Sequence, residues 1–201
     1  MNSNEQRLPQ VYLARHGETE WTITGQHTGV TDLPLTERGE RNARRLGDRL
    51  KGLNFTRIFT SPLQRATRTC ELAGFGSVAV VDPDLVEWNY GLFDGKTTEQ
   101  IHQQRPGWEL FRDGCPNGES VSDVAVRAKR VIKRLQDIDS DVLLFSSGHF
   151  LCVLAACWLN LEPVAGHRLF LGTAALSILG YNHGRYDPVL RLWNDCAHDG
   201  Q

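Results

Sequence analysis

The stretch VYLARHG, residues Val11–Gly17, decides how the rest of this 201-residue chain is interpreted. Its four leading residues predict a short buried strand that stops at Arg15 and His16, and Gly17 permits a tight turn after them. An arginine and a histidine therefore stand at the carboxyl end of a strand. In open α/β sheets this end of the strands forms the crevice where ligands bind.

Strands and helices alternate after this first strand. Further strands are predicted at 57–60, 78–81, 141–145, 175–180 and 189–193, and helices at 37–51, from Ser61 onward, at 119–138 and at 150–159. Thr36 is the predicted N-cap of the first helix, whereas Ser61 and Pro62 are the predicted cap and first residue of the second. The alternation predicts an α/β fold, a three-layer α/β/α sandwich with a mostly parallel, six-stranded mixed sheet. We expect one domain over 1–201 with a core at about 11–194, because no linker or internal repeat interrupts the pattern.

Composition excludes several classes of partner. The 22 Lys and Arg residues against 24 Asp and Glu give a formal net charge of -2, so no basic field is available for nucleic acid or an anionic membrane. The five cysteines form no CxxC pair, which predicts reduced thiols rather than a disulfide framework or a zinc cluster. The first ten residues are polar, and no unbroken apolar run is long enough to span a bilayer. These features predict a cytoplasmic protein.

Charged and ionisable side chains follow several of the predicted parallel strands. Arg65 comes shortly after the second strand, Glu87 lies in the loop after the third, and His149 follows the fourth. With Arg15 and His16 they make two arginines, two histidines and a carboxylate, a set suited to phosphoryl transfer. The planar guanidinium matches phosphate oxygens, and nearby helix amino ends add partial positive charge. We therefore expect a site for a phosphate dianion.

The same residues suggest a covalent mechanism. A neutral imidazole such as that of His16 can attack phosphorus at physiological pH and form a phosphohistidine. Glu87, beside aromatic side chains, would protonate the leaving alcohol and then activate water. No motif for a metal ion or a nucleotide is present, so we expect no metal and no cofactor. Another histidine, His27, is near enough in sequence to touch the substrate.

Four ordered motifs resemble those of the histidine phosphatase superfamily, also called phosphoglycerate mutase-like. They are LARHGETEW at 13–21, SPLQRATRT at 61–69, EWNYG at 87–91 and SSGH at 146–149. The resemblance implies that His16 is the phosphorylated nucleophile, that Glu87 is the proton donor, and that Arg15, Arg65 and His149 form the phosphate pocket. Further residues at positions expected to line the pocket or bind substrate are Thr22, Gln26, Thr28, Gly29, Ser61 and Tyr90.

Within the superfamily the chain is most similar to sedoheptulose bisphosphatases and bacterial sugar phosphatases. This implies hydrolysis of a small phosphorylated metabolite, such as a sugar phosphate or bisphosphate. The sugar bisphosphatases carry an arginine three residues after the second catalytic histidine, where this chain has Cys152. We therefore expect a preference for monophosphates, or binding of a second phosphate by another cation, namely Lys96, Arg112 or Arg168.

Two other functions remain as alternatives. A cofactor-dependent phosphoglycerate mutase would need to keep water from its phosphohistidine, whereas the short segment 88–106 offers no long basic lid. A non-catalytic phosphate-binding or interaction module is less favoured, because all five candidate catalytic residues are present.

Overall fold

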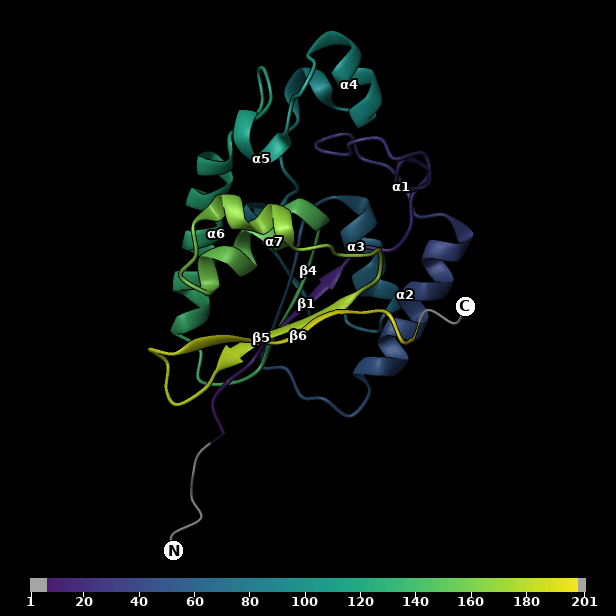
Figure 1. The fold of residues 1–201 in the computed structure, drawn as a ribbon. Coiled ribbons are helices and arrows are strands. Elements are labelled where there is room, and N and C mark those ends of the chain that lie inside the picture. Colours follow the sequence, from purple (N-terminus) through teal and green to yellow (C-terminus); the bar gives the residue numbers. More distant parts are fainter. Residues whose placement is uncertain (1–6, 199–201) are drawn as a thin grey trace, which may run out of the picture.

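The computed structural model describes residues 7–198, which form a twisted sheet with helices on both faces (Figure 1). The strands are β1 (Val11–Arg15), β2 (Arg57–Thr60), β3 (Val80–Val81), β4 (Val142–Ser146), β5 (Leu176–Tyr181) and β6 (Pro188–Asp195). The helices are α1 (Glu20–Thr24), α2 (Glu37–Leu50), α3 (Gln64–Leu72), α4 (Thr98–Gln104), α5 (Leu110–Asp113), α6 (Val121–Gln136) and α7 (Gly148–Trp158). Short 3₁₀ helices are η1 (Pro83–Leu85), η2 (Gly91–Phe93) and η3 (Pro163–Arg168). Residues 1–6 of the polar amino-terminal stretch lie outside the described residues.

The sheet has the order β3-β2-β4-β1-β5-β6. The pairs β3–β2, β2–β4 and β4–β1 are parallel, whereas β5 is antiparallel to both β1 and β6. The prediction of a mostly parallel, six-stranded mixed sheet is confirmed.

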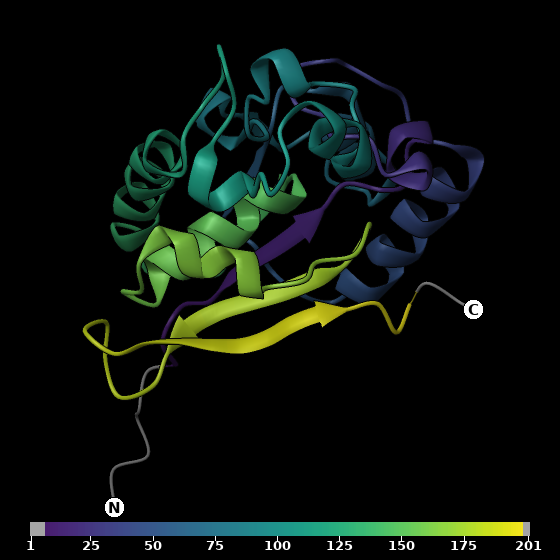
Figure 2. The same ribbon diagram turned by 45° about the horizontal axis from the view of Figure 1, so that its top comes forward.

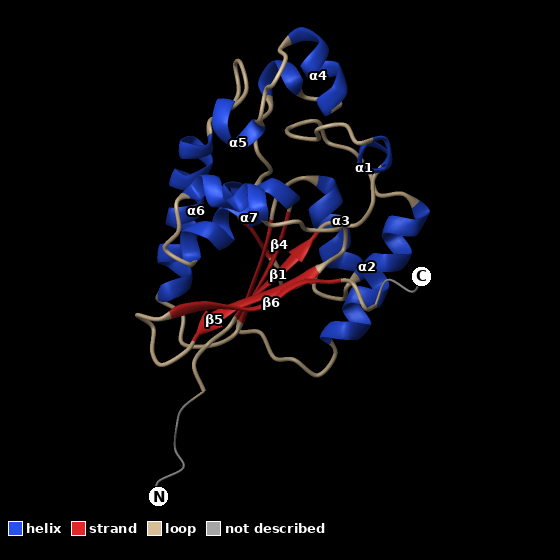
Figure 3. Ribbon diagram, viewed as in Figure 1, coloured by secondary structure: helices blue, strands red, loops and turns tan. Residues whose placement is uncertain are grey.

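Alternating side chains of the central strands produce the two outer layers. Val11 and Leu13 of β1 are buried in the core that includes α6 and α7, and Tyr12 and Ala14 are buried in the core that includes α2 and α3. This alternation is what a strand covered on both faces requires. Figure 3 shows the strands between the two groups of helices, and the turned view in Figure 2 keeps α7 on one side and α2 on the other. The expected three-layer α/β/α arrangement is therefore observed.

The register of the two central strands brings distant motifs together. Arg15 at the end of β1 pairs with Ser146 at the end of β4, and the His16 amide donates to the Ser146 carbonyl oxygen at 2.9 Å. The next residue, Gly17, lies against the amino-terminal turn of α2. A Cβ atom at Gly17 would come within 2.6 Å of the Gly39 carbonyl oxygen, so only glycine allows this approach. The histidine is thereby fixed at the carboxyl edge of the sheet.

The structure differs from the sequence prediction at the start of α3. Ser61 is not the N-cap, because the helix begins at Gln64 and Leu63 occupies the cap position. The Ser61 hydroxyl accepts a hydrogen bond from the Leu63 amide at 3.4 Å, which makes a turn ahead of the helix. The first helical amide, that of Gln64, instead donates to Asp32 Oδ1 at 2.8 Å. An acceptor from another loop thus replaces the expected local cap.

Other helix and strand boundaries differ from the predicted ones by fewer residues. The strand predicted at 78–81 is shortened to Val80–Val81, because the amides of Val78 and Ala79 donate to the Phe75 carbonyl oxygen in a turn. Thr36 is the N-cap of α2, as predicted, and its hydroxyl accepts from the Gly39 amide. Helices α1, α4 and α5 were not predicted. Within the described residues, every helix is too short or too polar to cross a membrane.

Candidate active site

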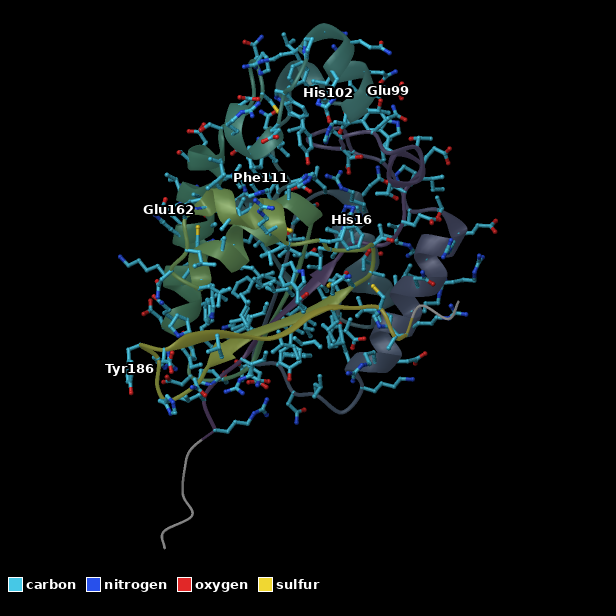
Figure 4. The ribbon with its side chains drawn as sticks, in the orientation of Figure 1. His16, Glu99, His102, Phe111, Glu162 and Tyr186 are labelled. Atoms are coloured by element: carbon cyan, nitrogen blue, oxygen red, sulfur yellow. The ribbon has the colours of Figure 1, made fainter. Side chains whose placement is uncertain are left out.

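A cavity of about 270 Å³ opens at the carboxyl ends of β1 and β4. Eight of the predicted site residues line it: Arg15, His16, Thr22, Gln26, Thr28, Glu87, Tyr90 and His149. They come from the ends of strands, from α1 and its following loop, from the loop after β3 and from the start of α7. Figure 4 shows His16 near the middle of the molecule, below the segment that carries His102 and Phe111. Residues distant in sequence therefore converge as expected from the strand ends.

His16 is oriented by its own backbone neighbour. Its side chain is buried, and its Nδ1 lies 2.8 Å from the Gly17 carbonyl oxygen. Since a carbonyl oxygen only accepts, Nδ1 carries the proton and donates, which leaves the lone pair on Nε2 free. Burial, followed by the charges of Arg65 and Arg15, lowers the pKa of His16 well below 6.5. The imidazole is therefore neutral and nucleophilic at physiological pH.

Arg15, which is partly exposed, and Arg65, which is fully buried, flank this histidine without an ion-pair partner among the described residues. Within the described residues, surface arginines such as Arg7 and Arg130 form ion pairs with carboxylates, but neither Arg15 nor Arg65 does. The Nε atom of each is buried and has no hydrogen-bond partner. Burial lowers the pKa of both guanidinium groups. An unpaired buried charge is costly. This arrangement is typical of an anion-binding site.

The two arginines are held differently. Arg15 donates through NH1 to the Leu171 carbonyl oxygen, and its guanidinium lies beside Gly148, where a Cβ would be 3.2 Å from its Nε. Arg65 does not line the cavity. Its terminal nitrogens donate to the carbonyl oxygens of Thr28, Gly29 and Thr31, so it fixes the loop that forms one wall while its charge acts on His16.

His149 has the opposite tautomer to His16. Its Nδ1 lies 2.5 Å from the Tyr90 hydroxyl. Burial raises the pKa of Tyr90 well above 10 and lowers the pKa of His149. We assign the phenol as the donor to Nδ1, which puts the proton of His149 on Nε2. One histidine thus offers a lone pair and the other an N–H donor.

Glu87 is fixed by three backbone amides. Its Oε1 accepts from Trp88 and Phe150 at 2.9 and 2.7 Å, and its Oε2 accepts from His149 at 3.0 Å. Two of these donors belong to the first turn of α7, whose partial positive charge favours a carboxylate there. Oε2 accepts a single one of these bonds and keeps capacity for a proton from the cavity side.

Sequence reasoning missed the residue that supports the Glu87 loop. Arg127 of α6 pairs with Glu119 at 2.8 Å, and both side chains are largely buried. Its guanidinium also donates to the carbonyl oxygens of Asp84, Val86 and Glu87. An arginine on an amphipathic helix is most simply a solvated side chain, so no signal in the sequence identified it.

Of the remaining predicted substrate-binding residues, three line the cavity and two do not. The side chains of Thr22, Gln26 and Thr28 line the cavity but already form hydrogen bonds. Thr22 and Thr28 donate to nearby carbonyl oxygens, and Gln26 Nε2 donates across to the Gly95 carbonyl oxygen at 2.7 Å. Gly29 and Ser61 lie outside the cavity lining. The Gly29 amide donates to Asp94 Oδ1, and Ser61 is fully buried in the turn before α3.

His27 and an apolar segment complete the lining. His27 packs against Tyr90 at 4.9 Å between ring centroids, and burial lowers its pKa to about 4. The apolar segment Leu169–Leu171, together with Trp21 and Cys152, forms another part of the wall. The segment 96–115 with α4 and α5 lies beside the cavity: Trp108 packs against His27 at 5.6 Å and Phe111 against His149 at 5.7 Å between ring centroids.

Comparison with known proteins agrees with this geometry. A sequence model of the histidine phosphatase superfamily (branch 1) matches residues 11–196, and the chain belongs to this superfamily. It is 38% identical over 182 residues to an acid phosphatase of Mycobacterium tuberculosis, covering 89% of each chain. It is 38% identical over 186 residues to sedoheptulose 1,7-bisphosphatase of Saccharomyces cerevisiae, covering 76% of this chain and 68% of the yeast protein.

Two further comparisons bear on function and fold. A probable phosphoglycerate mutase of Cronobacter sakazakii is 36% identical over 202 residues, covering 94% of each chain. A solved structure of a Mycobacterium tuberculosis open reading frame superposes with a TM-score of 0.88 at 35% identity, covering 94% of this chain and 98% of that one. The predicted superfamily and fold are confirmed. The phosphatase relatives also bear out the prediction of a phosphatase.

Proposed function

We propose that this chain hydrolyses phosphate monoesters of small metabolites, sugar phosphates among them, through a phosphohistidine on His16 and without a metal ion. The observation that carries the proposal is the pair of guanidinium groups of Arg15 and Arg65, which form no ion pair among the described residues, beside a neutral nucleophile. A phosphate dianion in the cavity would balance their charge and accept from Arg15 and from Nε2–H of His149, whereas Arg65, which does not line the cavity, would act through its charge.

The residues support a two-step transfer. In the first step the Nε2 lone pair of His16 forms the N–P bond, the P–O bond to the alcohol breaks, and Glu87 supplies the proton that the alcohol oxygen takes up. In the second step Glu87 takes a proton from water, the water oxygen bonds to phosphorus, and the N–P bond breaks. His16 is restored, and Glu87 is again protonated for the next cycle.

The decisive experiment traps the intermediate. Wild-type enzyme mixed with ³²P-labelled substrate and denatured in alkali should retain base-stable, acid-labile label on His16, and His16→Ala should lose both the label and turnover. His102→Ala is a matched control, because His102 does not line the cavity. Turnover should also survive a chelator. Near wild-type turnover by His16→Ala would refute the covalent mechanism.

The mutase alternative makes a different prediction. A mutase would isomerise 3-phosphoglycerate and require 2,3-bisphosphoglycerate, whereas a phosphatase releases inorganic phosphate without it. The short segment 88–106, which carries no long basic insertion, supports hydrolysis. The five cysteines are free thiols, which supports our proposal of a cytoplasmic location.

A further inference from the structure

β6 is the edge strand of the sheet (Figure 1), and it carries a bulge near its carboxyl end. The pairing of β5 with β6 shifts register there, so that Trp193 and Asn194 of β6 stand opposite the single residue Ser177 of β5. The Asn194 amide donates to the buried Ser177 hydroxyl at 3.0 Å, and Asn194 has a φ of 57°. This left-handed conformation is one that asparagine adopts more readily than most residues. In a regular strand two successive side chains point to opposite faces, whereas a bulge can direct both to the same side.

Both side chains of the bulge bond to the segment between η3 and β5. Trp193 Nε1 donates to the Phe170 carbonyl oxygen at 2.6 Å, and Asn194 Oδ1 accepts from the Gly172 amide at 2.7 Å. Because a backbone amide can only donate, the oxygen of the Asn194 side chain, and not its nitrogen, faces Gly172. The bulge therefore fixes the backbone on both sides of Leu171.

The segment that the bulge fixes contacts the phosphate site directly. The Leu171 carbonyl oxygen accepts a hydrogen bond from Arg15 NH1. Further along, the Ala174 amide donates to the His16 carbonyl oxygen at 3.0 Å, and the Arg15 amide donates to the Ala175 carbonyl oxygen at 3.1 Å. Ala174 is fully buried and also has a φ of 57°. The conformation of this irregular segment therefore decides where the Leu171 carbonyl oxygen holds the guanidinium.

We propose that Asn194 is a positioning residue for phosphate binding: by fixing Gly172, it keeps the Leu171 carbonyl oxygen where it holds the Arg15 guanidinium at the cavity. This inference rests on the proposed phosphatase function, in which Arg15 binds the phosphate group. An arginine side chain has many rotamers, and a carbonyl acceptor restricts them only if the carbonyl itself is fixed. Asn194 does not line the cavity, so it acts through the segment and not on the substrate.

The test separates the hydrogen bond from the backbone conformation. Glycine adopts the left-handed region without strain, so Asn194→Gly removes the acceptor and keeps the bulge, whereas Asn194→Asp keeps an oxygen in place. Asn194→Gly should weaken the binding of inorganic phosphate, measured by isothermal titration calorimetry, by about threefold to tenfold. It should lower kcat/KM for an aryl phosphate by a similar factor. Asn194→Asp should stay within about twofold of the wild type in both measurements.

A matched control is Asn160→Gly. Asn160 also has a φ of 57°, and it is exposed just after α7, outside the cavity lining. This variant should leave phosphate binding and kcat/KM unchanged. If Asn194→Gly does not fold, Asn194→Ser makes the same comparison, because its shorter side chain reaches less far toward Gly172.

A double-mutant cycle tests the route through Arg15. In an Arg15→Ala background, Asn194→Gly should change kcat/KM for the aryl phosphate by less than about twofold, because the guanidinium that Asn194 positions is absent. A loss of the same size in both backgrounds would overturn the proposal, since Asn194 would then act on the packing of the site and not through Arg15.

The remaining outcomes separate this inference from the proposed function. Unchanged phosphate affinity and kcat/KM in folded Asn194→Gly would overturn the positioning role and leave the phosphatase mechanism intact. A loss in Asn194→Asp as large as that in Asn194→Gly would do the same, because the acceptor would not be what matters. If the wild type neither binds inorganic phosphate nor hydrolyses the aryl phosphate, the proposed function fails and this inference fails with it.

Discussion

Replacing Tyr90 by phenylalanine should impair catalysis, because the His149 ring would no longer be held in a single tautomer. The Tyr90 hydroxyl is buried and lies 2.5 Å from Nδ1 of His149; as the assigned donor it keeps the proton of this histidine on Nε2. Without the hydroxyl, the imidazole can hold its proton on Nδ1, and Nε2 would then present a lone pair to a phosphate oxygen. The Nε2 lone pair of His149 and the phosphate oxygen would both be acceptors, whereas the proposed mechanism needs an N–H donor from His149.

The magnitude follows from the bond that is lost. A buried hydrogen bond whose removal leaves a partner unsatisfied is worth about 1–3 kcal/mol, or roughly 5- to 150-fold in kcat/KM. Phenylalanine keeps the ring contact with His27, whose centroid lies 4.9 Å away, so the fold should be retained. Because the effect acts on the bound phosphate group, aryl and alkyl phosphates should be slowed by the same factor.

The assay combines kinetics with spectroscopy. ¹⁵N NMR of the His149 ring should report protonated Nε2 in the wild type and a mixture of tautomers in Tyr90→Phe. Tyr12→Phe is a matched control, since Tyr12 is also buried but its hydroxyl bonds to Gln10. A double-mutant cycle adds Tyr90→Phe to His149→Ala.

Two results would refute the reasoning. An unchanged tautomer and unchanged kcat/KM in folded Tyr90→Phe would show that the hydroxyl does not orient the ring. A loss of the same size in the His149→Ala background would show that Tyr90 acts on the substrate directly rather than through His149.

Three further predictions follow from neighbouring contacts. Glu87→Gln should slow alkyl phosphates about 100-fold more than aryl phosphates, which need little protonation, and equal slowing measured by kcat/KM would assign the proton to another group. Gly148→Ala should lower kcat/KM about tenfold with little change in Tm, because its Cβ would lie 3.2 Å from Arg15 Nε and displace the guanidinium; unchanged kcat/KM would contradict this. Stability should fall from pH 6.5 toward pH 4, because the unfolded chain binds a proton on His27 that the fold excludes, whereas the pKa in the fold is about 4. His27 accounts for at most about 3 kcal/mol of this loss in urea unfolding, and His27→Gln should make the profile less steep while the buried His16 and His149 keep a residual slope.

The part of the site formed by Arg15, His16 and His149 could be predicted, because these residues stand at or just after the ends of parallel strands. Parallel strands that end in Arg15-His16 and before His149 must present these residues at one edge, and the β1–β4 register places them side by side. The local cap at Thr36 was equally predictable, since hydroxyl and helix are neighbours in sequence.

The apolar wall formed by Leu169–Leu171 could not be predicted, because the groups that bond to its backbone come from distant parts of the chain. The segment Leu169–Leu171 shows neither helical nor strand periodicity, and its carbonyl partners Arg15, Cys152 and Trp193 belong to β1, α7 and β6. The misplaced cap at Ser61 has the same origin, since the acceptor for α3 is Asp32 of another loop. Local sequence patterns do not report contacts of this range.

The same two arginines attract the phosphate and prepare the nucleophile. Their charges add to burial in lowering the pKa of His16, so the imidazole keeps its lone pair before substrate arrives. A carboxylate beside either arginine would neutralise that charge, raise the pKa of His16 again and compete with phosphate for the guanidinium groups. Glu87 reduces this conflict without removing it: its charge acts to raise the pKa of both arginines, but its oxygens accept from the amides of Trp88, His149 and Phe150 and form no ion pair with Arg15 or Arg65. In the proposed mechanism the site therefore holds its acid while neither arginine forms an ion pair with it.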